Sequence, residues 1–136
     1  MDRVSGATRS RNMAAVRSRD TAPEMVVRRE AHRLGYRYRL HVPELPGSPD
    51  LVFPRFKKVI FVHGCFWHQH VGCKKAKRPE KNTNFWNAKL DRNVERDAEN
   101  LVALSQAGWQ SLVIWECQTN QRVDLEQILT QFLDVE

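Results

Sequence analysis

Three short apolar runs limit most strongly the folds that this chain can adopt. They are Leu51-Val52-Phe53, Val59-Ile60-Phe61-Val62 and Leu112-Val113-Ile114-Trp115. Continuous apolar runs of this length are typical of strands that are buried on both faces. A turn over residues 54–58 joins the first two runs. The sequence therefore predicts a central hairpin in a sheet that helices cover.

The segment before this hairpin predicts a helix and then a strand. Thr21-Ala22-Pro23-Glu24 fits a capping box with proline in the first turn, so a helix begins near Thr21, and Gly35 ends it. Over residues 36–41 apolar and polar side chains alternate, which predicts a half-buried strand. Its inward positions are Tyr36, Tyr38 and Leu40, and its outward positions are Arg37, Arg39 and His41.

Two further helices are expected after the hairpin. A long one covers residues 83–107 and a short amphipathic one residues 125–133, with the apolar run at 112–115 as a strand between them. The inward positions of the long helix are Trp86, Leu90, Val94, Leu101 and Leu104. The element order α-β-β-β-α-β-α gives an α/β fold with a mixed sheet flanked by helices. A chain of 136 residues has room for one domain and hardly for two, so we expect a single domain over residues 1–136.

The charge distribution indicates a polyanionic partner. Lysine and arginine total 22 against 16 acidic residues, which gives a formal net charge of +6. The basic residues gather in an arm over residues 1–20 and in a second cluster over residues 74–81, and two such clusters favour nucleic acid. No apolar run is long enough to span a bilayer, and residues 1–6 lack the apolar stretch of a secretory signal. We therefore expect a cytoplasmic protein without a membrane partner.

The irregular segment over residues 63–82 is rich in side chains that bind metals. Cys65, His68, His70 and Cys73 lie within nine residues, and zinc takes four nitrogen or sulfur ligands in a tetrahedron. Cys117 follows the last strand, where strand ends and loops converge, and would staple this loop to the sheet. Three cysteines without an export signal favour metal ligands or buried thiols over disulfides. The spacing leaves open whether His68 or His70 is the ligand.

Asp50 is the candidate ligand of a catalytic metal. It follows Pro49 at the start of a strand, and His63 leaves the partner strand of the same hairpin. Magnesium-dependent nucleases hold their ion with a carboxylate on one strand beside polar groups at the end of the next strand. The competing interpretation is that Asp50 only starts the strand.

Four other polar residues are weaker candidates for proton transfer or water binding. His63 and His68 flank the start of the proposed zinc loop, and histidine exchanges protons near neutral pH. Glu24 has a rival role as the capping residue of the first helix. Asp97 could point inward from the long helix, although an exposed acid paired with an arginine is the commoner arrangement.

Two aromatic pairs lie outside the expected core. Phe66-Trp67 stands between a cysteine and a histidine in a polar loop. Large apolar side chains can be inserted between base steps of DNA, and a mismatched step is the easiest to open. Phe85-Trp86, at the start of the long helix, offers a second pair, of which Phe85 is expected to pack on the sheet.

Several motifs, in order along the chain, closely resemble one family, the very short patch repair (Vsr) endonucleases. They are Ala7-Thr8-Arg9-Ser10-Arg11-Asn12-Met13, Pro46-Gly47-Ser48-Pro49-Asp50, His63-Gly64-Cys65-Phe66-Trp67-His68, Asn93-Val94-Glu95-Arg96-Asp97, Gly108-Trp109 and Trp115-Glu116-Cys117. The resemblance implies a fold like that of type II restriction endonucleases. It also implies an Mg²⁺-dependent nick on the 5′ side of the thymine in a T·G mismatch, which arises by deamination of 5-methylcytosine.

The same resemblance implies roles for individual residues. Asp50 and the backbone carbonyl of Val62 would hold Mg²⁺, and His68 would be the catalytic histidine. Glu24, His63 and Asp97 would form the surrounding water and hydrogen-bond shell. The implied zinc ligands are Cys65, His70, Cys73 and Cys117, and the implied intercalating residues are Phe66, Trp67 and Trp86.

The resemblance further implies partners. The protein would act as a monomer on double-stranded DNA in a bacterial-type nucleoid, beside a cytosine-5 DNA methyltransferase, with general mismatch repair proteins as further candidates. Two alternatives stand beside this function. A sequence-specific restriction endonuclease of the same fold would cut both strands of an undamaged duplex. A non-catalytic zinc module that binds distorted DNA would make no demand on Asp50.

Overall fold

The computed structural model describes residues 20–134, so the basic arm expected over residues 1–20 lies, apart from Asp20, outside the described part. Its strands are β1 (Arg39–Leu40), β2 (Leu51–Phe53), β3 (Lys58–His63) and β4 (Gln110–Trp115), in the sheet order β1-β2-β3-β4. β2 is antiparallel to both β1 and β3, whereas β3 and β4 are parallel. The mixed sheet that the sequence predicts is confirmed.

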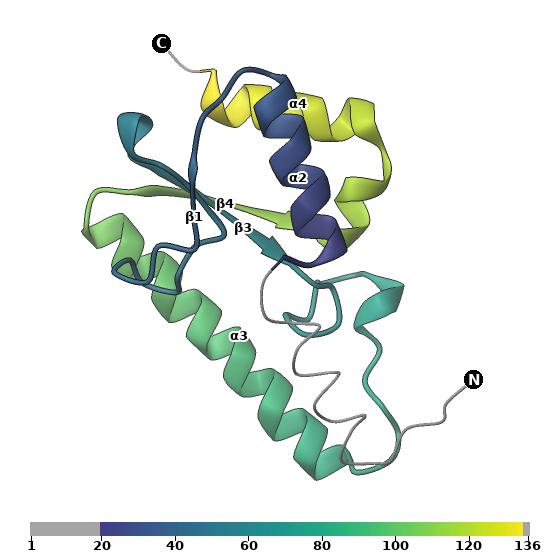
Figure 1. The fold of residues 1–136 in the computed structure, drawn as a ribbon. Coiled ribbons are helices and arrows are strands. Elements are labelled where there is room, and N and C mark those ends of the chain that lie inside the picture. The colour runs from purple at the N-terminus through teal and green to yellow at the C-terminus, as the bar shows by residue number, and fades with distance from the viewer. Residues whose placement is uncertain (1–19, 135–136) are drawn as a thin grey trace.

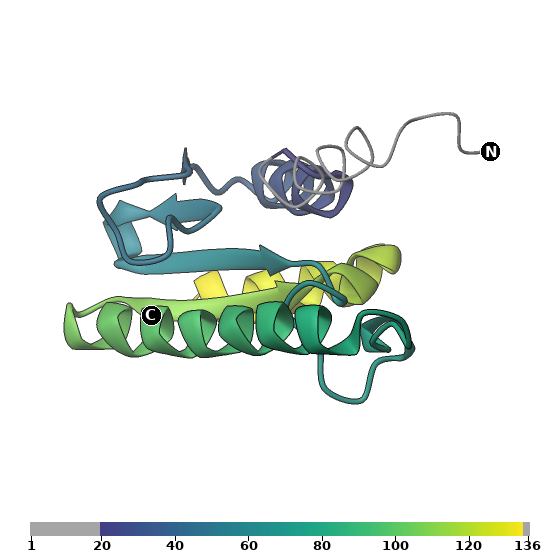
Figure 2. The ribbon, with the colours of Figure 1, turned by 90° about the horizontal axis from the view of Figure 1, so that it is seen from below.

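Helices cover both faces of this sheet (Figure 1). α2 (Ala22–Arg33) and α4 (Arg122–Leu133) lie side by side on one face, and α3 (Thr83–Gln106) lies on the other. Figure 2 shows α3 running along the sheet next to β4. Within residues 20–134, no helix has both the length and the apolar character needed to cross a bilayer.

Alternate residues of the central strands face two separate cores. On the α2 and α4 side the buried residues are Val27, Ala31, Leu51, Phe53, Ile60, Ile114, Leu125, Leu129 and Leu133. On the α3 side they are Val52, Val59, Phe61 and Leu104. Each buried side chain of this size stabilises the fold by about 1.5–3 kcal/mol. Burial on both faces explains why the strand sequences are continuously apolar.

The first predicted strand is wrong in extent. Only residues 39–40 pair with β2. The left-handed backbone of His41 (φ 48°) ends the strand after Leu40. Tyr36 and Tyr38 do pack against the core on the α2 and α4 side, as their inward positions predict. Leu40, however, is 37% exposed.

Two predicted positions on α3 are also wrong. Phe85 is 60% exposed and Val94 is 42% exposed. The N-terminal part of α3 extends beyond the sheet (Figure 1), and Phe85 belongs to the first turn of this helix. The helix bounds themselves agree with the prediction, as do those of α2 and α4 within a few residues.

The last residues of β3 and β4 and the first residue of β2 lie at the same edge of the sheet. β3 and β4 are parallel with His63 opposite Trp115, so the residues that follow both strands leave at the same edge. β2 runs in the opposite direction and therefore begins there, directly after Asp50. Strand order and register thus bring together three segments that are far apart in the sequence.

Candidate active site

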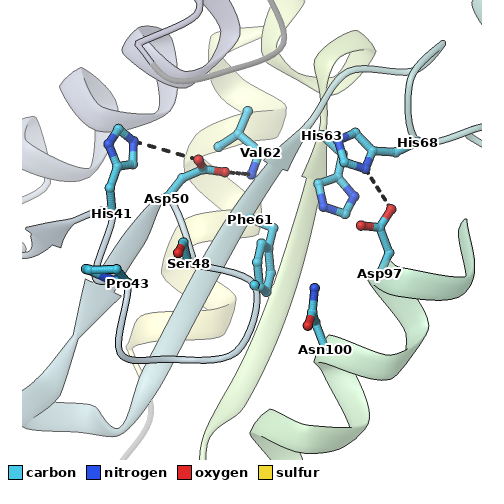
Figure 3. Close-up of a pocket in the computed structure, with 11 residues that line it drawn as sticks. His41, Pro43, Ser48, Asp50, Phe61, Val62, His63, His68, Asp97 and Asn100 are labelled. Carbon is cyan, nitrogen blue, oxygen red and sulfur yellow. Dashed lines mark hydrogen bonds and ion pairs between the residues drawn. The ribbon is translucent and has the colours of Figure 1, made fainter. Parts of the chain in front are cut away.

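Asp50 lies where β2 begins and β3 ends (Figure 3). Its Oδ2 accepts a hydrogen bond of 2.7 Å from the backbone N–H of Val62. Its side chain is only 18% exposed, and this burial raises the pKa of the carboxyl to about 6 despite that hydrogen bond. The N–H and the carbonyl of a strand residue point to the same side. The Val62 carbonyl is therefore expected on the Asp50 side of β3, so that two hard oxygens of the kind that Mg²⁺ prefers share one site.

Glu24 and His41 approach Asp50 from α2 and from the end of β1. His41 Nε2 lies 2.6 Å from Glu24 Oε2 and 3.8 Å from Asp50 Oδ1. Glu24 also caps α2, because its Oε1 accepts the N–H of Asp20 while its own N–H is donated to Thr21 Oγ1. Glu24 therefore bonds at the start of α2 through Oε1 and contacts His41 through Oε2, and its role in the site stays a prediction.

His41 is the site residue that the sequence missed. The alternating pattern places it on an outward face, yet its side chain is only 11% exposed. Arg39 pairs with Val52 and Leu40 with Leu51, so the antiparallel register sets His41 opposite Asp50, whose carbonyl accepts the His41 N–H at 3.3 Å. Only the register of this short ladder could have revealed the pairing.

A second group of side chains, His63, His68 and Asp97, lies beside Asp50. His68 Nδ1 is 2.6 Å from Oδ2 of Asp97 on α3, so the carboxylate orients the ring and the N–H at Nδ1 leaves Nε2 to exchange a proton. The ring of His63 stacks on that of His68 with centroids 3.8 Å apart. Burial lowers the pKa of His63 to about 3, so this ring is neutral near pH 7. Asp97 thus points inward, contrary to the commoner arrangement that the sequence suggested.

Two cavities meet at Asp50, Val62 and His68. The first, here called the α3-side cavity, measures about 380 Å³ and is also lined by Pro43, Gly47, Ser48, Phe61 and Asn100. The second, here called the aromatic-side cavity, measures about 270 Å³ and is also lined by Pro23, Glu24, Phe66, Trp67 and Glu116. A linear substrate that passes through both cavities would expose its middle to the carboxylate and the histidine.

Aromatic side chains gather beside the aromatic-side cavity. The ring centroids of Phe66, Trp67 and Trp86 lie 5.2–5.9 Å apart. Phe85 contacts Trp86 edge to face at 5.3 Å and is largely exposed. The backbone carbonyl of Trp67 accepts a hydrogen bond from Asn93, which ties the loop to α3. None of these four aromatic residues belongs to either hydrophobic core.

Cys65, His70, Cys73 and Cys117 form a compact cluster whose ligand atoms lie within 4.8 Å of one another. His70 Nδ1 is 3.6 Å from Cys65 Sγ and 3.4 Å from Cys117 Sγ. A tetrahedral zinc ion with bonds of about 2.3 Å to sulfur and about 2.0 Å to nitrogen would set these atoms about 3.5 Å apart. Burial raises the pKa of the Cys65 thiol to about 12, so a thiolate there needs a bound cation. The cluster fits zinc.

The fold around the cluster explains how two neighbouring histidines are separated. Gln69 has a left-handed backbone (φ 54°), which turns the chain between His68 and His70. His68 therefore meets Asp97, while His70 joins the cysteines and stacks on Trp115 with centroids 4.2 Å apart. His70 and not His68 lies in the cluster, and that His70 is a zinc ligand stays a prediction.

Fold and site together define the class of protein. A mixed four-stranded sheet flanked by helices is consistent with a restriction-endonuclease-like α/β fold, and Asp50 and His68 lie where β2 begins and β3 ends. Residues 1–75 match the family model described as DNA mismatch endonuclease Vsr. The chain belongs to the Vsr family and is a DNA endonuclease.

Similar proteins extend this match over nearly the whole chain. A type II nicking enzyme, V.XorIIP, of Xanthomonas oryzae pv. oryzae is 44% identical over 98% of this chain and 97% of its own length. The DNA mismatch endonuclease Vsr of Escherichia coli is 42% identical over 94% of this chain and 82% of its own length. The type II nicking enzyme V.NmeAIP of Neisseria meningitidis is 37% identical over 92% of this chain and 89% of its own length.

Proposed function

We propose that this enzyme nicks one DNA strand on the 5′ side of the thymine in a T·G mismatch that arises by deamination of 5-methylcytosine. The observation that carries the proposal is that Asp50 and His68 line the same cavity as Phe66 and Trp67, which belong to a cluster of half-buried aromatic rings. The relatives also support it, since they are named as a mismatch endonuclease and as nicking enzymes.

The reacting centre in this proposal is the pair Asp50 and His68. Asp50 and the Val62 carbonyl would hold Mg²⁺, which polarises a scissile phosphate and stabilises its leaving oxygen. His68 exchanges a proton at Nε2 with the reacting oxygen, and Asp97 keeps the ring in place. His63 supports the same ring without adding charge, because burial keeps it neutral.

Glu24 and His41 take a supporting role. Their hydrogen bond of 2.6 Å places a carboxylate and an imidazole next to Asp50, where they can orient water at the edge of the site.

The cysteine and histidine cluster has a structural role in this proposal. Cys65, His70, Cys73 and Cys117 would hold Zn²⁺, which supplies a cross-link between the loop and the end of β4. The backbone N–H of Cys65 also donates to Glu116 Oε1 at 3.1 Å, so the protein itself ties the two segments together. The loop held in this way carries His68 and the pair Phe66-Trp67.

The aromatic cluster accounts for mismatch selection. Phe66, Trp67 and Trp86 would enter the base stack beside the mismatch, and a mispaired step costs less to open than a paired one. The basic charge of the chain favours the duplex in general, whereas the rings favour the step that opens.

The proposal also covers the setting in which the enzyme works. It acts as a monomer, since one strand is cut, on nucleoid DNA in the cytoplasm. A cytosine-5 DNA methyltransferase supplies the 5-methylcytosine that deaminates, and general mismatch repair proteins are further candidate partners.

A nicking assay on matched duplexes tests this function. Wild-type protein with Mg²⁺ should nick a T·G duplex at one position and leave the T·A duplex intact. His68→Ala should slow nicking by about 10²–10⁴-fold, the usual contribution of general acid–base catalysis. His32→Ala, which changes an exposed histidine on α2, should leave the rate unchanged.

Two results would favour the alternatives. Cleavage of both strands of the T·A duplex would indicate a sequence-specific restriction endonuclease. Tight binding of distorted DNA without cleavage under any metal condition would indicate a non-catalytic zinc module.

A further inference from the structure

The α3-side cavity is the part of the site for which the proposed function gives no occupant. It shares Asp50, Val62 and His68 with the aromatic-side cavity and continues between the loop over residues 43–48 and α3 (Figure 3). Its volume of about 380 Å³ is within the range of pockets that hold small ligands, about 300–1,000 Å³.

The direction of the DNA strand follows from the positions of the two cavities. If the thymine lies by the aromatic rings and the phosphate on its 5′ side lies at Asp50, the preceding nucleotide must lie on the opposite side of Asp50. That side is the α3-side cavity. This step rests on the proposed function.

Asn100 is a polar residue of this cavity to which the proposed function gives no role. Its side chain extends from α3 into the cavity, as Figure 3 shows, and it makes no hydrogen bond with the described residues. An amide carries a donor and an acceptor side by side, which matches the edge of a nucleobase. The described residues that line the cavity include no lysine or arginine, so its chemistry suits a base better than a phosphate.

Gly47 gives this amide its room. A Cβ at Gly47 would lie 2.9 Å from Asn100 Nδ2 and 3.0 Å from Asn100 Cγ, closer than ordinary contacts allow. Gly47 also has a left-handed backbone (φ +77°), which only glycine adopts readily. The missing Cβ and the left-handed backbone of Gly47 therefore allow the loop to pack closely against the Asn100 side chain.

We propose that the α3-side cavity binds the nucleotide on the 5′ side of the scissile phosphate and that Asn100 contacts the edge of its base. Asn100 is then a residue that reads the base before the mismatch. Ser48, whose hydroxyl lines the same cavity, is positioned to contact the sugar or base of the same nucleotide.

The test compares T·G duplexes that differ only in this nucleotide. One set carries each of the four bases there, and one duplex carries an abasic site with the opposite base kept. Single-turnover nicking rates are measured for wild-type protein, for Asn100→Leu and for Gln106→Leu. The last variant removes an exposed amide from the same helix and serves as the matched control.

Wild-type protein should lose roughly 5- to 150-fold in rate when its preferred base is removed, as expected for one paired base contact. Asn100→Leu should show this loss on the intact duplex and no further loss on the abasic one. Gln106→Leu should behave like wild type. If leucine disturbs folding, seen as a lower melting temperature, Asn100→Ala gives the same comparison with a smaller side chain.

A multiplicative result would overturn the inference. If Asn100→Leu on the abasic duplex is slower than wild type on the intact duplex by the product of the two factors measured separately, Asn100 does not contact that base. The mismatch proposal fails by a different measurement, namely equal nicking of T·G and T·A duplexes by wild-type protein.

Discussion

Two sites built from one short segment differ in what they can do. His63 and His68 belong to the centre around Asp50, while Cys65, His70 and Cys73 belong to the zinc-type cluster. The cluster is closed, because its four ligand atoms lie within 4.8 Å of one another. They would occupy all four coordination positions of a tetrahedral ion and leave none for a substrate. The centre is open to two cavities and keeps a buried carboxylate whose pKa is raised to about 6.

The comparison shows how stability and reactivity are separated over a few residues. A closed tetrahedral site contributes folding free energy, whereas an open site holds groups in a state that costs stability. Backbone hydrogen bonds from His70 N–H to the Cys65 carbonyl and from His68 N–H to the Gly64 carbonyl fix the turns between them. The loop can therefore be held firmly by one site while it presents His68 to the other.

The largest expected effect comes from opening the closed site with Cys117→Ala. Structural zinc contributes about 10–16 kcal/mol of apparent binding free energy to the folds that hold it, and a lost ligand forfeits a large part of it. We expect the variant to bind less zinc, to melt at a much lower temperature and to lose nicking. Metal analysis and thermal melting measure this, with exposed Asn120→Ala as the control. Unchanged zinc content would remove Cys117 from the site.

The next effect separates function from stability at the open site. Asp50→Asn should reduce nicking by at least about 10²–10³-fold, because a charged stabilising group is lost. The same change should stabilise the protein at pH 8 in the absence of Mg²⁺. Below about pH 3 Asp50 is protonated in both the folded and the unfolded state, so it costs nothing there. Above about pH 6 the folded protein must ionise a buried carboxyl whose pKa is raised, which lowers its stability.

The expected gain of Asp50→Asn is about 1–3 kcal/mol in the free energy of unfolding at pH 8, since each pKa unit corresponds to about 1.4 kcal/mol. It should vanish near pH 3. Urea unfolding of both zinc-loaded proteins without added Mg²⁺ measures the difference at each pH. A variant less stable than wild type at pH 8 would show that the carboxylate is held by favourable contacts and not at a cost.

The smallest effect concerns His41, which joins Glu24 to Asp50. His41→Leu removes a donor to a carboxylate, and such hydrogen bonds contribute about 1.5–3 kcal/mol. We expect nicking to fall by about tenfold and to require more Mg²⁺, with zinc content unchanged. His41→Gln keeps an N–H donor and should recover most of the rate. Equal losses in both variants would assign His41 a packing role only.

Local spacing in the sequence was sufficient for most of the fold. The apolar runs at 51–53, 59–62 and 112–115 form β2, β3 and β4, and the capping residues of α2 lie where the sequence places them. These features depend on near neighbours along the chain. The predicted burial of Phe85 and Val94 was wrong, because the exposure of a helix residue depends on which distant segments pack against the helix.

The sequence by itself also supplied the ligand types of both sites: the cysteines and histidines of residues 65–73, and Asp50 at the start of a strand. Only the tertiary structure decided how they are sorted. The parallel register of β3 and β4 brings Cys117 to Cys65, the left-handed turn at Gln69 sends His68 and His70 apart, and the β1–β2 register sets His41 opposite Asp50. Register and backbone direction are properties of segments distant in the chain, and no local pattern of residue types encodes them.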